Sequence, residues 1–316
     1  MNNTPHTNCL TLRLLHAAKG YKAVAFDIFD TLLKRDCARP ADLFALMEVT
    51  HQAALGFAEA RVAAEAETRQ TLGREVTLAE IYAHPALRGT DPAAECAAEL
   101  AMIAPNRPVA QAAAACHARG QKVYAVSDMY LPKTQIEAML QKCGLDFLDG
   151  VFVSCEYGVQ KRSGKLFKLF LQQTTLRPAE VLFVGDNPRA DFAGAALAGI
   201  RCFLLPQPTP LPYTKTPADA VGGVTAATLQ NCCQNLSLSA ALGAELLGPL
   251  AVGFATWLHG QRAAIPGAKL VFLARDMYLV RQVYQLLYPE EETFYLKASR
   301  QSLLPALLQC PMNEQA

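Results

Sequence analysis

The sequence predicts an α/β fold built on a parallel sheet, with a helical domain inserted after the first strand. Short apolar runs alternate with amphipathic helical patterns, which is the arrangement that crossover connections between parallel strands produce. The first of these runs, Ala23–Phe29, leads into Asp30 and Thr31 and contains Asp27. Acidic side chains at the carboxyl end of a buried strand lie where open α/β sheets bind ligands, so this run also predicts a functional site.

The predicted strands and helices of this core follow each other in regular order. The further apolar runs expected to be strands are Lys122–Val126, Gly150–Val153, Val181–Val184 and Arg201–Leu205. The helical patterns between them cover Pro132–Cys143, Lys165–Thr174 and Ala190–Ala198. Proline is well tolerated in the first turn of a helix, which fits Pro132. The core is therefore assigned to residues 21–39 and 121–205.

Residues 40–120 interrupt the core between its first two strands. Their composition is almost purely helix-forming, and no run in them predicts a strand. Pro40 and Asp42 open one predicted helix, while Thr77 and Glu80 have the spacing of a capping box for another. A helical insertion above the strand-end carboxylates is expected to act as a lid, with a purely stabilising insertion as the open alternative.

The chain after the core is expected to form a second, partial α/β unit. Prolines recur through residues 206–217 and predict a semi-rigid linker. Residues 218–316 then show a helical region to Gln261, a strand at Lys269–Ala274, a helix at Met277–Tyr288 and a strand at Thr293–Ala298. The segment Val271–Leu279 repeats the pattern of Val123–Leu131, with Asp-Met-Tyr-Leu in both. The repeat indicates a degenerate Rossmann-like unit.

The bulk composition favours a soluble protein that acts on small molecules. Of 316 residues, 52% are hydrophobic, and the formal net charge is +1. Basic residues are scattered, so neither a nucleic-acid partner nor an anionic membrane surface is expected. The apolar segment Glu245–Leu258 is too short to span a bilayer, and the ten cysteines show no metal-ligand spacing. We therefore expect a cytoplasmic location without membrane insertion.

Polar residues gather at or near the ends of the predicted core strands. In chain order they are Asp27 with Asp30 and Thr31, Ser127, Lys161, and Asp186 with Asp191. Together they resemble the four motifs of the haloacid dehalogenase (HAD) superfamily, with residues 40–120 in the place of a C1-type helical cap. The resemblance covers about residues 21–205. It implies a HAD-like Rossmannoid sheet with an inserted α-helical cap.

The resemblance implies Mg²⁺-dependent phosphoryl chemistry. Asp27 would be the nucleophile that forms an aspartyl-phosphate. Mg²⁺ would be held by Asp27 and Asp186, by the backbone carbonyl of Phe29, and by Asp191 in the surrounding shell. The motifs FDIFDTLL and SDMYL resemble a branch whose members are often associated with glycosyltransferases and surface-polysaccharide synthesis. A small phosphorylated substrate is therefore expected, and this association favours a sugar-linked one.

The other motif residues would act on the transferring phosphoryl group. Ser127 would donate a hydrogen bond to its oxygens, and Lys161, preferred over Lys165, would offset its negative charge. Thr31 in the first motif is also expected to bind substrate. Two arginines follow this motif at the entrance to the cap, and both are candidates to contact an anionic substrate, with a solvated surface role equally open: Arg35 and Arg39.

The first motif departs from the family at the position of the usual acid/base group. HAD phosphatases place an aspartate two residues after the nucleophile, whereas this chain has Phe29, which cannot move a proton. Asp30 follows one position later, where the family usually has glycine. Three interpretations stay open: a phosphatase in which Asp30 or a cap residue supplies the proton, a carbon-halide hydrolase, and a non-catalytic module that binds a phosphorylated ligand. The phosphatase is the prediction adopted.

Overall fold

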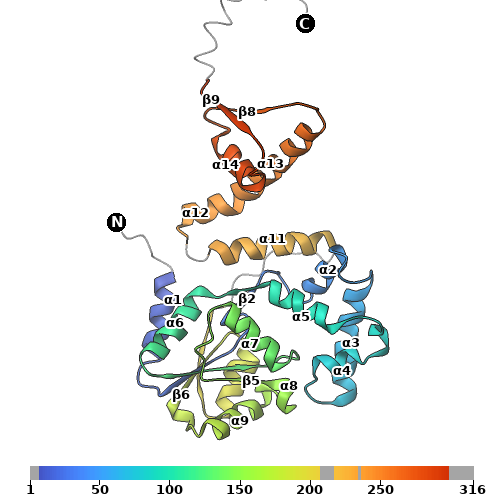
Figure 1. Cartoon of the computed structure of the whole chain (residues 1–316). Helices are drawn as coiled ribbons and strands as arrows, with labels where there is room; N and C mark the ends of the chain where they lie inside the picture. The colour runs from blue at the N-terminus through green and yellow to red at the C-terminus, as the bar shows by residue number, and fades with distance from the viewer. Residues whose placement is uncertain (1–6, 207–216, 234–235, 299–316) are drawn as a thin grey trace, which may run out of the picture. The chain divides into compact units, whose positions relative to one another are not determined.

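The computed structural model describes residues 7–206, 217–233 and 236–298. It divides into two compact units, Met1–Ser237 and Leu238–Ala316, each with its own set of elements (Figure 1). The first unit contains the sheet, the helical insertion and the strand-end carboxylates. The second contains a shorter strand–helix–strand arrangement.

The first unit is built on five parallel strands in the order β5-β4-β1-β6-β7. Their bounds are β1 Ala23–Phe26, β4 Lys122–Ser127, β5 Gly150–Val153, β6 Val181–Gly185 and β7 Arg201–Leu204. The chain runs outward from β1 through β4 to β5, and then crosses to β6 and β7 on the other side of β1. This order confirms the predicted α/β fold with a parallel sheet. It also places a topological switch point beside the end of β1, where such sheets bind ligands.

Alternation of side chains along β1 explains why both faces of the sheet are covered. Val24 and Phe26 lie in one buried apolar cluster, while Ala23 and Ala25 lie in another, because successive residues of a strand point to opposite faces. The first cluster includes residues of α1 Thr7–Ala17, α6 Arg107–Ala118 and α7 Lys133–Lys142. The second includes residues of α9 Lys165–Thr174 and α10 Gly194–Leu197. Short elements connect these layers: α8 Ser154–Tyr157 and η3 Pro178–Glu180.

The insertion is mainly helical, as predicted. Its helices are α2 Asp42–Val49, α3 Phe57–Leu72, α4 Leu78–Tyr82, the single turn η1 Pro85–Leu87 and α5 Pro92–Ala101. The predicted capping box begins α4: the Thr77 side chain accepts a hydrogen bond from the Glu80 backbone N–H, and the Glu80 carboxylate accepts one from the Thr77 N–H at 2.9 Å. The sequence therefore indicated this helix start correctly.

The absence of strands from residues 40–120 was predicted wrongly. Ile103–Pro105 forms β3, which pairs antiparallel with β2, Leu33–Arg35. Strands of three residues are too short to produce a period-two pattern in the sequence, which explains the omission. The same expected insertion also contained α6, which packs against α1 and β4 beside the sheet.

The helix α11, Pro217–Cys233, packs against α2 and β2 in the first unit. Its Asn231 side chain donates hydrogen bonds to the Asp36 carboxylate at 2.8 Å and to the Arg35 carbonyl at 3.0 Å. The sequence-based division had assigned this helix to the C-terminal unit. Residues 207–216 of the expected linker lie outside the described residues.

The second unit is a partial α/β unit, as expected. It contains α12 Leu238–Leu242, η5 Gly243–Leu247, α13 Gly248–Ala263, β8 Leu270–Leu273, α14 Tyr278–Leu287 and β9 Thr293–Leu296. β8 and β9 are parallel, and Ala255, Phe272 and Tyr284 form the buried core beneath them. The strand-to-helix order of β8 and α14 matches that of β4 and α7, the segments in which the sequence repeat lies.

The apolar segment of the second unit belongs to a longer helix than the sequence predicted. Within the described part of the chain, the continuous helical segment Ser239–Ala263 has 25 residues. An 18-residue stretch of it has a mean hydropathy of 1.4, and 11% of that stretch is buried. By length and composition this helix could cross a membrane, so the argument that it is too short does not hold. A single helix of this kind is weak support for insertion, because core helices of soluble proteins meet the same criteria.

Candidate active site

Two neighbouring strands bring the first pair of carboxylates together. Asp27 directly follows β1, and Asp186 directly follows β6. β1 and β6 are paired with Phe26 opposite Val184, and the Asp27 backbone N–H donates a hydrogen bond to the Val184 carbonyl at 2.8 Å. This register places both acids at the carboxyl edge of the sheet, beside the switch point.

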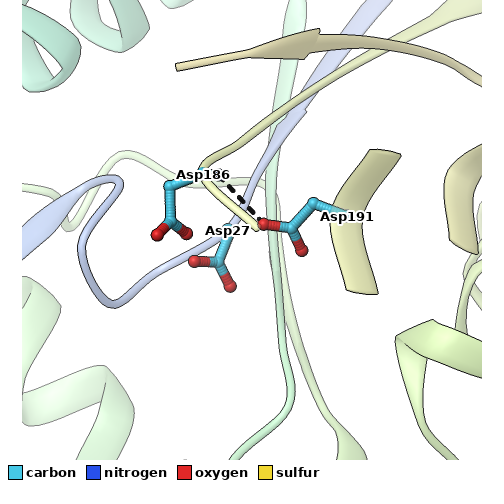
Figure 2. Close-up of side chains that lie close together, drawn as sticks. All are labelled: Asp27, Asp186 and Asp191. Atoms are coloured by element: carbon cyan, nitrogen blue, oxygen red, sulfur yellow. Dashed lines mark hydrogen bonds between the residues drawn. The ribbon is translucent and has the colours of Figure 1, made fainter. Parts of the chain in front are cut away.

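A third carboxylate joins them from the helical turn η4, Pro188–Ala193 (Figure 2). Oxygen atoms of Asp27, Asp186 and Asp191 lie within 4.8 Å of one another. One oxygen of Asp191, Oδ2, accepts hydrogen bonds from the backbone N–H groups of Asp186 and Asn187, each at 3.0 Å. Asp191 therefore holds the backbone that carries Asp186.

Lys161 is the positive charge of this cluster. It begins the short helical turn η2, Lys161–Ser163, and it is buried. Its Nζ lies 2.5 Å from Oδ1 of Asp27 and 2.6 Å from Oδ1 of Asp191. Its backbone N–H donates a hydrogen bond to the carboxylate of Asp128 at 2.8 Å. The lysine is thus held both at its main chain and at its ammonium group.

Burial dominates the electrostatics of the cluster. Burial raises the pKa of Asp27 to about 8, against the opposing effect of Lys161 and with a further increase from the charges of Asp191 and Asp186. Burial alone would lower the pKa of Lys161, but the neighbouring carboxylates outweigh it and raise that pKa. When all three acids are ionised, the single ammonium group offsets only one of their three negative charges. A divalent cation would relieve the remaining repulsion.

The residues present fit such a cation. Carboxylate oxygens are the ligands that Mg²⁺ and other hard divalent ions prefer, and three of them converge here. Both oxygens of Asp191 are already engaged, by Lys161 and by backbone N–H groups. Asp186 accepts a hydrogen bond from the Thr31 hydroxyl at 3.4 Å. This arrangement makes Asp27 and Asp186 the better direct ligands and Asp191 the support.

A cavity of about 310 Å³ opens beside the cluster. The charged and polar part of its lining consists of Asp27, Asp30, Arg35, Ser127, Asp128, Lys161, Asp186, Asn187 and Asp191, and the rest of Phe29, Pro40, Met129, Tyr130 and Ala190. A buried acid, a lysine and a hydroxyl group therefore line one open cavity. These groups can bind an anion, orient it and present a carboxylate nucleophile to it.

Residues 21–199, more than half of the chain, match the model of one protein family, described as haloacid dehalogenase-like hydrolase. The chain belongs to this family. The match covers strands β1, β4, β5 and β6 of the sheet, the helical insertion and every residue of the carboxylate cluster. The family predicted from the four motifs is thus confirmed, and the chain carries the core of a hydrolase.

Other proteins resemble parts of this HAD-like chain. Phosphoserine phosphatase from Thermus thermophilus is 43% identical over 51 residues, which are 16% of this chain and 20% of that enzyme. The match thus spans about a fifth of that relative's length. A solved HAD family enzyme from Bacteroides thetaiotaomicron is 16% identical, covering 59% of this chain and 94% of that chain, with a TM-score of 0.44. The L-2-haloacid dehalogenase of Xanthobacter autotrophicus is 24% identical, covering 58% and 76%, with a TM-score of 0.41.

The structure brings most of the sequence-predicted site residues of the HAD-like core to this cavity. Ser127 is buried at the end of β4 and lines the cavity. Lys161 lies in the cluster, whereas Lys165 is exposed on α9, which agrees with the choice made from the sequence. Thr31 is buried and contacts Asp186. Phe29, whose backbone carbonyl was the third predicted metal ligand, lines the same cavity as Asp27.

The two candidate arginines are engaged by acids of the helical insertion. Arg35 lines the cavity and makes two hydrogen bonds to the Glu99 carboxylate, at 3.0 Å and 3.3 Å. Arg39 pairs with Asp42 at 2.8 Å and is not among the described residues that line the cavity. Of the two, only Arg35 is placed where a bound substrate would meet it.

Asp30 has an unusual backbone conformation. Its φ of 59° lies in the left-handed region, which glycine adopts freely and aspartate tolerates better than most residues. The side chain lines the cavity but is 54% exposed, and Oδ1 lies 3.5 Å from Nζ of Lys34. The left-handed φ accounts for the usual glycine at this position of the family, and aspartate is among the residues that tolerate it.

Two residues that position the HAD-like site were not predicted from the sequence. Asp128 precedes α7, which follows Pro132 without a side-chain cap, and the Asp128 carboxylate accepts a hydrogen bond from the Lys161 N–H. Asn187 begins η4 by accepting the backbone N–H groups of Arg189 and Ala190 at 2.9 and 3.0 Å. An Asn-Pro pair after a strand is a helix-start signal, and it was available in the sequence.

Proposed function

We propose that this chain is a Mg²⁺-dependent phosphohydrolase that acts on small phosphorylated molecules through an aspartyl-phosphate on Asp27. One observation carries the proposal: the Asp27 carboxylate lies in the cavity wall, 2.5 Å from the Lys161 ammonium group and within 4.8 Å of two further carboxylates. A carboxylate so placed is a nucleophile with a cation beside the charge that must be stabilised.

The metal would be held by oxygen atoms of the first and last motifs. Asp27 and Asp186 would be its side-chain ligands, with the Phe29 carbonyl as a third, and Asp191 would hold Asp186 in place. When bound, Mg²⁺ supplies positive charge to the phosphoryl oxygens and lowers the repulsion between them and the acids.

The protein side chains would carry the phosphoryl transfer itself. The Asp27 carboxylate attacks phosphorus, and the bond from phosphorus to the leaving oxygen breaks with its electron pair on that oxygen. Ser127 donates a hydrogen bond to the phosphoryl oxygens, and Lys161 offsets charge on the nucleophile and the transferring group. Water then attacks phosphorus, and the electron pair of the broken bond returns to the Asp27 carboxylate.

A non-catalytic binding module is the second candidate, and Phe29 is the observation that favours it. Phe29 lies in the cavity wall beside the nucleophile and offers no proton for a leaving group. In that case the same cluster would bind a phosphorylated ligand and metal without turnover. Binding and turnover are separable by experiment.

The test is a panel of phosphorylated compounds with the purified protein and Mg²⁺. We would measure phosphate release from acetyl phosphate, 4-nitrophenyl phosphate and several sugar phosphates, with Asp27→Asn beside the wild type and the exposed Asp146→Asn as a matched control. Loss of activity in Asp27→Asn alone is expected. Activity that survives in Asp27→Asn would sink the nucleophile assignment, whereas phosphate binding without turnover supports the binding module and halide release from 2-haloacids a carbon-halide hydrolase.

A further inference from the structure

Part of the wall of the cavity is apolar. Phe29, Pro40, Met129 and Tyr130 all line it. Arg35 adds one cation, because its guanidinium carbon lies 3.9 Å from the centroid of the Phe29 ring. Flat apolar side chains and a stacked guanidinium group favour a planar or apolar group on the substrate.

Arg35 is fixed on this wall and does not act as an acid. Glu99 accepts two of its N–H groups, and burial of the guanidinium is outweighed by the Glu99 charge, so the pKa of Arg35 is raised. A guanidinium group can offset charge on a departing group but does not give up its proton. Tyr130 is also a poor proton donor, because burial raises its pKa well above the ordinary value of a tyrosine.

The two carboxyl groups outside the metal cluster are also held by donors. Asp30 is paired with Lys34 at 3.5 Å and is more than half exposed. Asp128 accepts the backbone N–H of Lys161 at 2.8 Å. One oxygen of each side chain is therefore engaged as an acceptor. Burial raises the pKa of Asp128, so Asp128 is the group whose role as a proton donor the variants below have to exclude.

We propose that the site takes phosphorylated substrates whose leaving group departs as a stable anion, namely aryl phosphates and acyl phosphates. This inference rests on the proposed function. The Asp27 oxygen bonds to phosphorus, the bond to the leaving oxygen breaks, and that oxygen leaves with the electron pair as a phenolate or carboxylate without taking up a proton. Alkyl and sugar phosphates, whose alkoxide needs a proton, react slowly at this site.

The second half of the reaction is expected to be slow for the same reason. Water attacks the phosphorus of the aspartyl-phosphate and releases its proton to solvent, with no side chain of the Phe29 wall to accept it. The phosphorylated Asp27 therefore accumulates. A burst of leaving group, close to one equivalent per protein, precedes the steady rate.

The experiment is a leaving-group series with the full chain and Mg²⁺. We expect kcat/KM for 4-nitrophenyl phosphate and acetyl phosphate to exceed that for glycerol phosphate and sugar phosphates by roughly 10²–10⁴, the factor that a general acid commonly supplies. Phe29→Asp should narrow this ratio by at least tenfold and abolish the burst. Phe29→Asn, of similar size but unable to transfer a proton, should not narrow it.

The wild-type series decides the inference even where the variants do not fold. Equal kcat/KM for aryl and alkyl phosphates, lost in Asp27→Asn, would overturn the leaving-group inference and leave the proposed function intact. If no leaving group is released in a reaction that depends on Asp27, both the leaving-group inference and the proposed function are overturned.

Two further variants test the engaged carboxyl groups. Asp30→Asn and Asp128→Asn should preserve the ratio of aryl to alkyl turnover, whatever their effect on the absolute rates. A rise of tenfold or more in that ratio would identify the substituted residue as a proton donor, because its loss would penalise alkyl substrates most. That result would overturn the inference.

Discussion

The Cα of Gly185 lies so close to the carboxylate of Asp191 that a Cβ atom on it would be 2.4 Å from Oδ2. That same oxygen accepts the backbone N–H groups of Asp186 and Asn187. The glycine that ends β6 therefore allows the acid of η4 to reach the loop that carries Asp186. A side chain at this position and the observed hydrogen bonds cannot coexist.

Gly185→Ala should therefore damage the site and the fold together. The methyl group displaces Asp191 and releases Asp186, and overpacking of this kind commonly costs about 1–3 kcal/mol. We expect a lower midpoint in urea unfolding and a loss of kcat/KM. The matched control is Gly150→Ala at the start of β5, where a Cβ would meet the Tyr124 ring at 3.4 Å, an ordinary contact. Wild-type activity in Gly185→Ala would contradict the role assigned to Asp191.

The metal-free protein should lose stability as the pH rises. The pKa of Asp27 is 3.8 in the unfolded chain and about 8 in the fold, chiefly because of burial. The folded state therefore holds this proton more tightly, so the contribution is fully present below about pH 4 and is lost as the pH rises to about 8. Asp27→Asn has no carboxyl group to ionise at this position. At pH 8 it should therefore be more stable than the wild type, by a margin on the order of a few kcal/mol.

Unfolding in urea with a chelator present, at pH 5 and pH 8, measures this effect. The difference between wild type and Asp27→Asn isolates Asp27, because all other ionisable groups are common to both proteins. An equal loss of stability in the two proteins between these pH values would show that Asp27 ionises freely in the fold.

Divalent metal should stabilise the wild-type protein against unfolding. A ligand that binds only the folded state stabilises it by about 2.7 kcal/mol at a concentration of 100 times its Kd. Thermal unfolding with and without Mg²⁺ should show a rise in Tm for wild type and for the exposed Asp146→Asn. Asp186→Asn should show a much smaller rise. A full rise in Asp186→Asn would remove that residue from the ligand set.

The sequence predicted those parts of the fold whose signals are local and repeated. The alternation in β1 places Val24 and Phe26 on one face and Ala23 and Ala25 on the other, and the strand-end position of Asp27 indicated the site. The capping box at Thr77 is equally local. These signals depend on neighbours in the chain, so a single sequence contains them.

The features that the sequence did not predict depend on contacts between distant residues. β2 and β3 are three residues each and exist only as a pair, so neither has a pattern of its own. The bond from the Lys161 N–H to Asp128 joins residues 33 positions apart. The engagement of both oxygens of Asp191 likewise requires the fold, and it is this geometry that separates supporting acids from ligands.

The helical insertion contains a buried ion pair whose loss should be costly. Arg61 on α3 and Glu95 on α5 are both fully buried and are joined by two hydrogen bonds, at 2.6 Å and 2.8 Å. The Tyr82 hydroxyl donates a further bond to Glu95 at 2.9 Å, and the Arg61 guanidinium lies 4.7 Å from the ring centroid of Tyr130. The pair therefore ties the two helices to each other and to a residue that lines the cavity.

Arg61→Met should destabilise the protein by about 3–5 kcal/mol, because it leaves the Glu95 charge buried without its partner. The double variant Arg61→Met with Glu95→Leu should recover much of that loss, since it removes both charges. Lys133→Met is the control: its pair with Glu137 is exposed and 3.7 Å long, so its loss should cost less than about 1 kcal/mol. Urea midpoints compare the variants. If Arg61→Met were as stable as Lys133→Met, Glu95 would have gained a proton or another hydrogen-bond donor in the absence of Arg61.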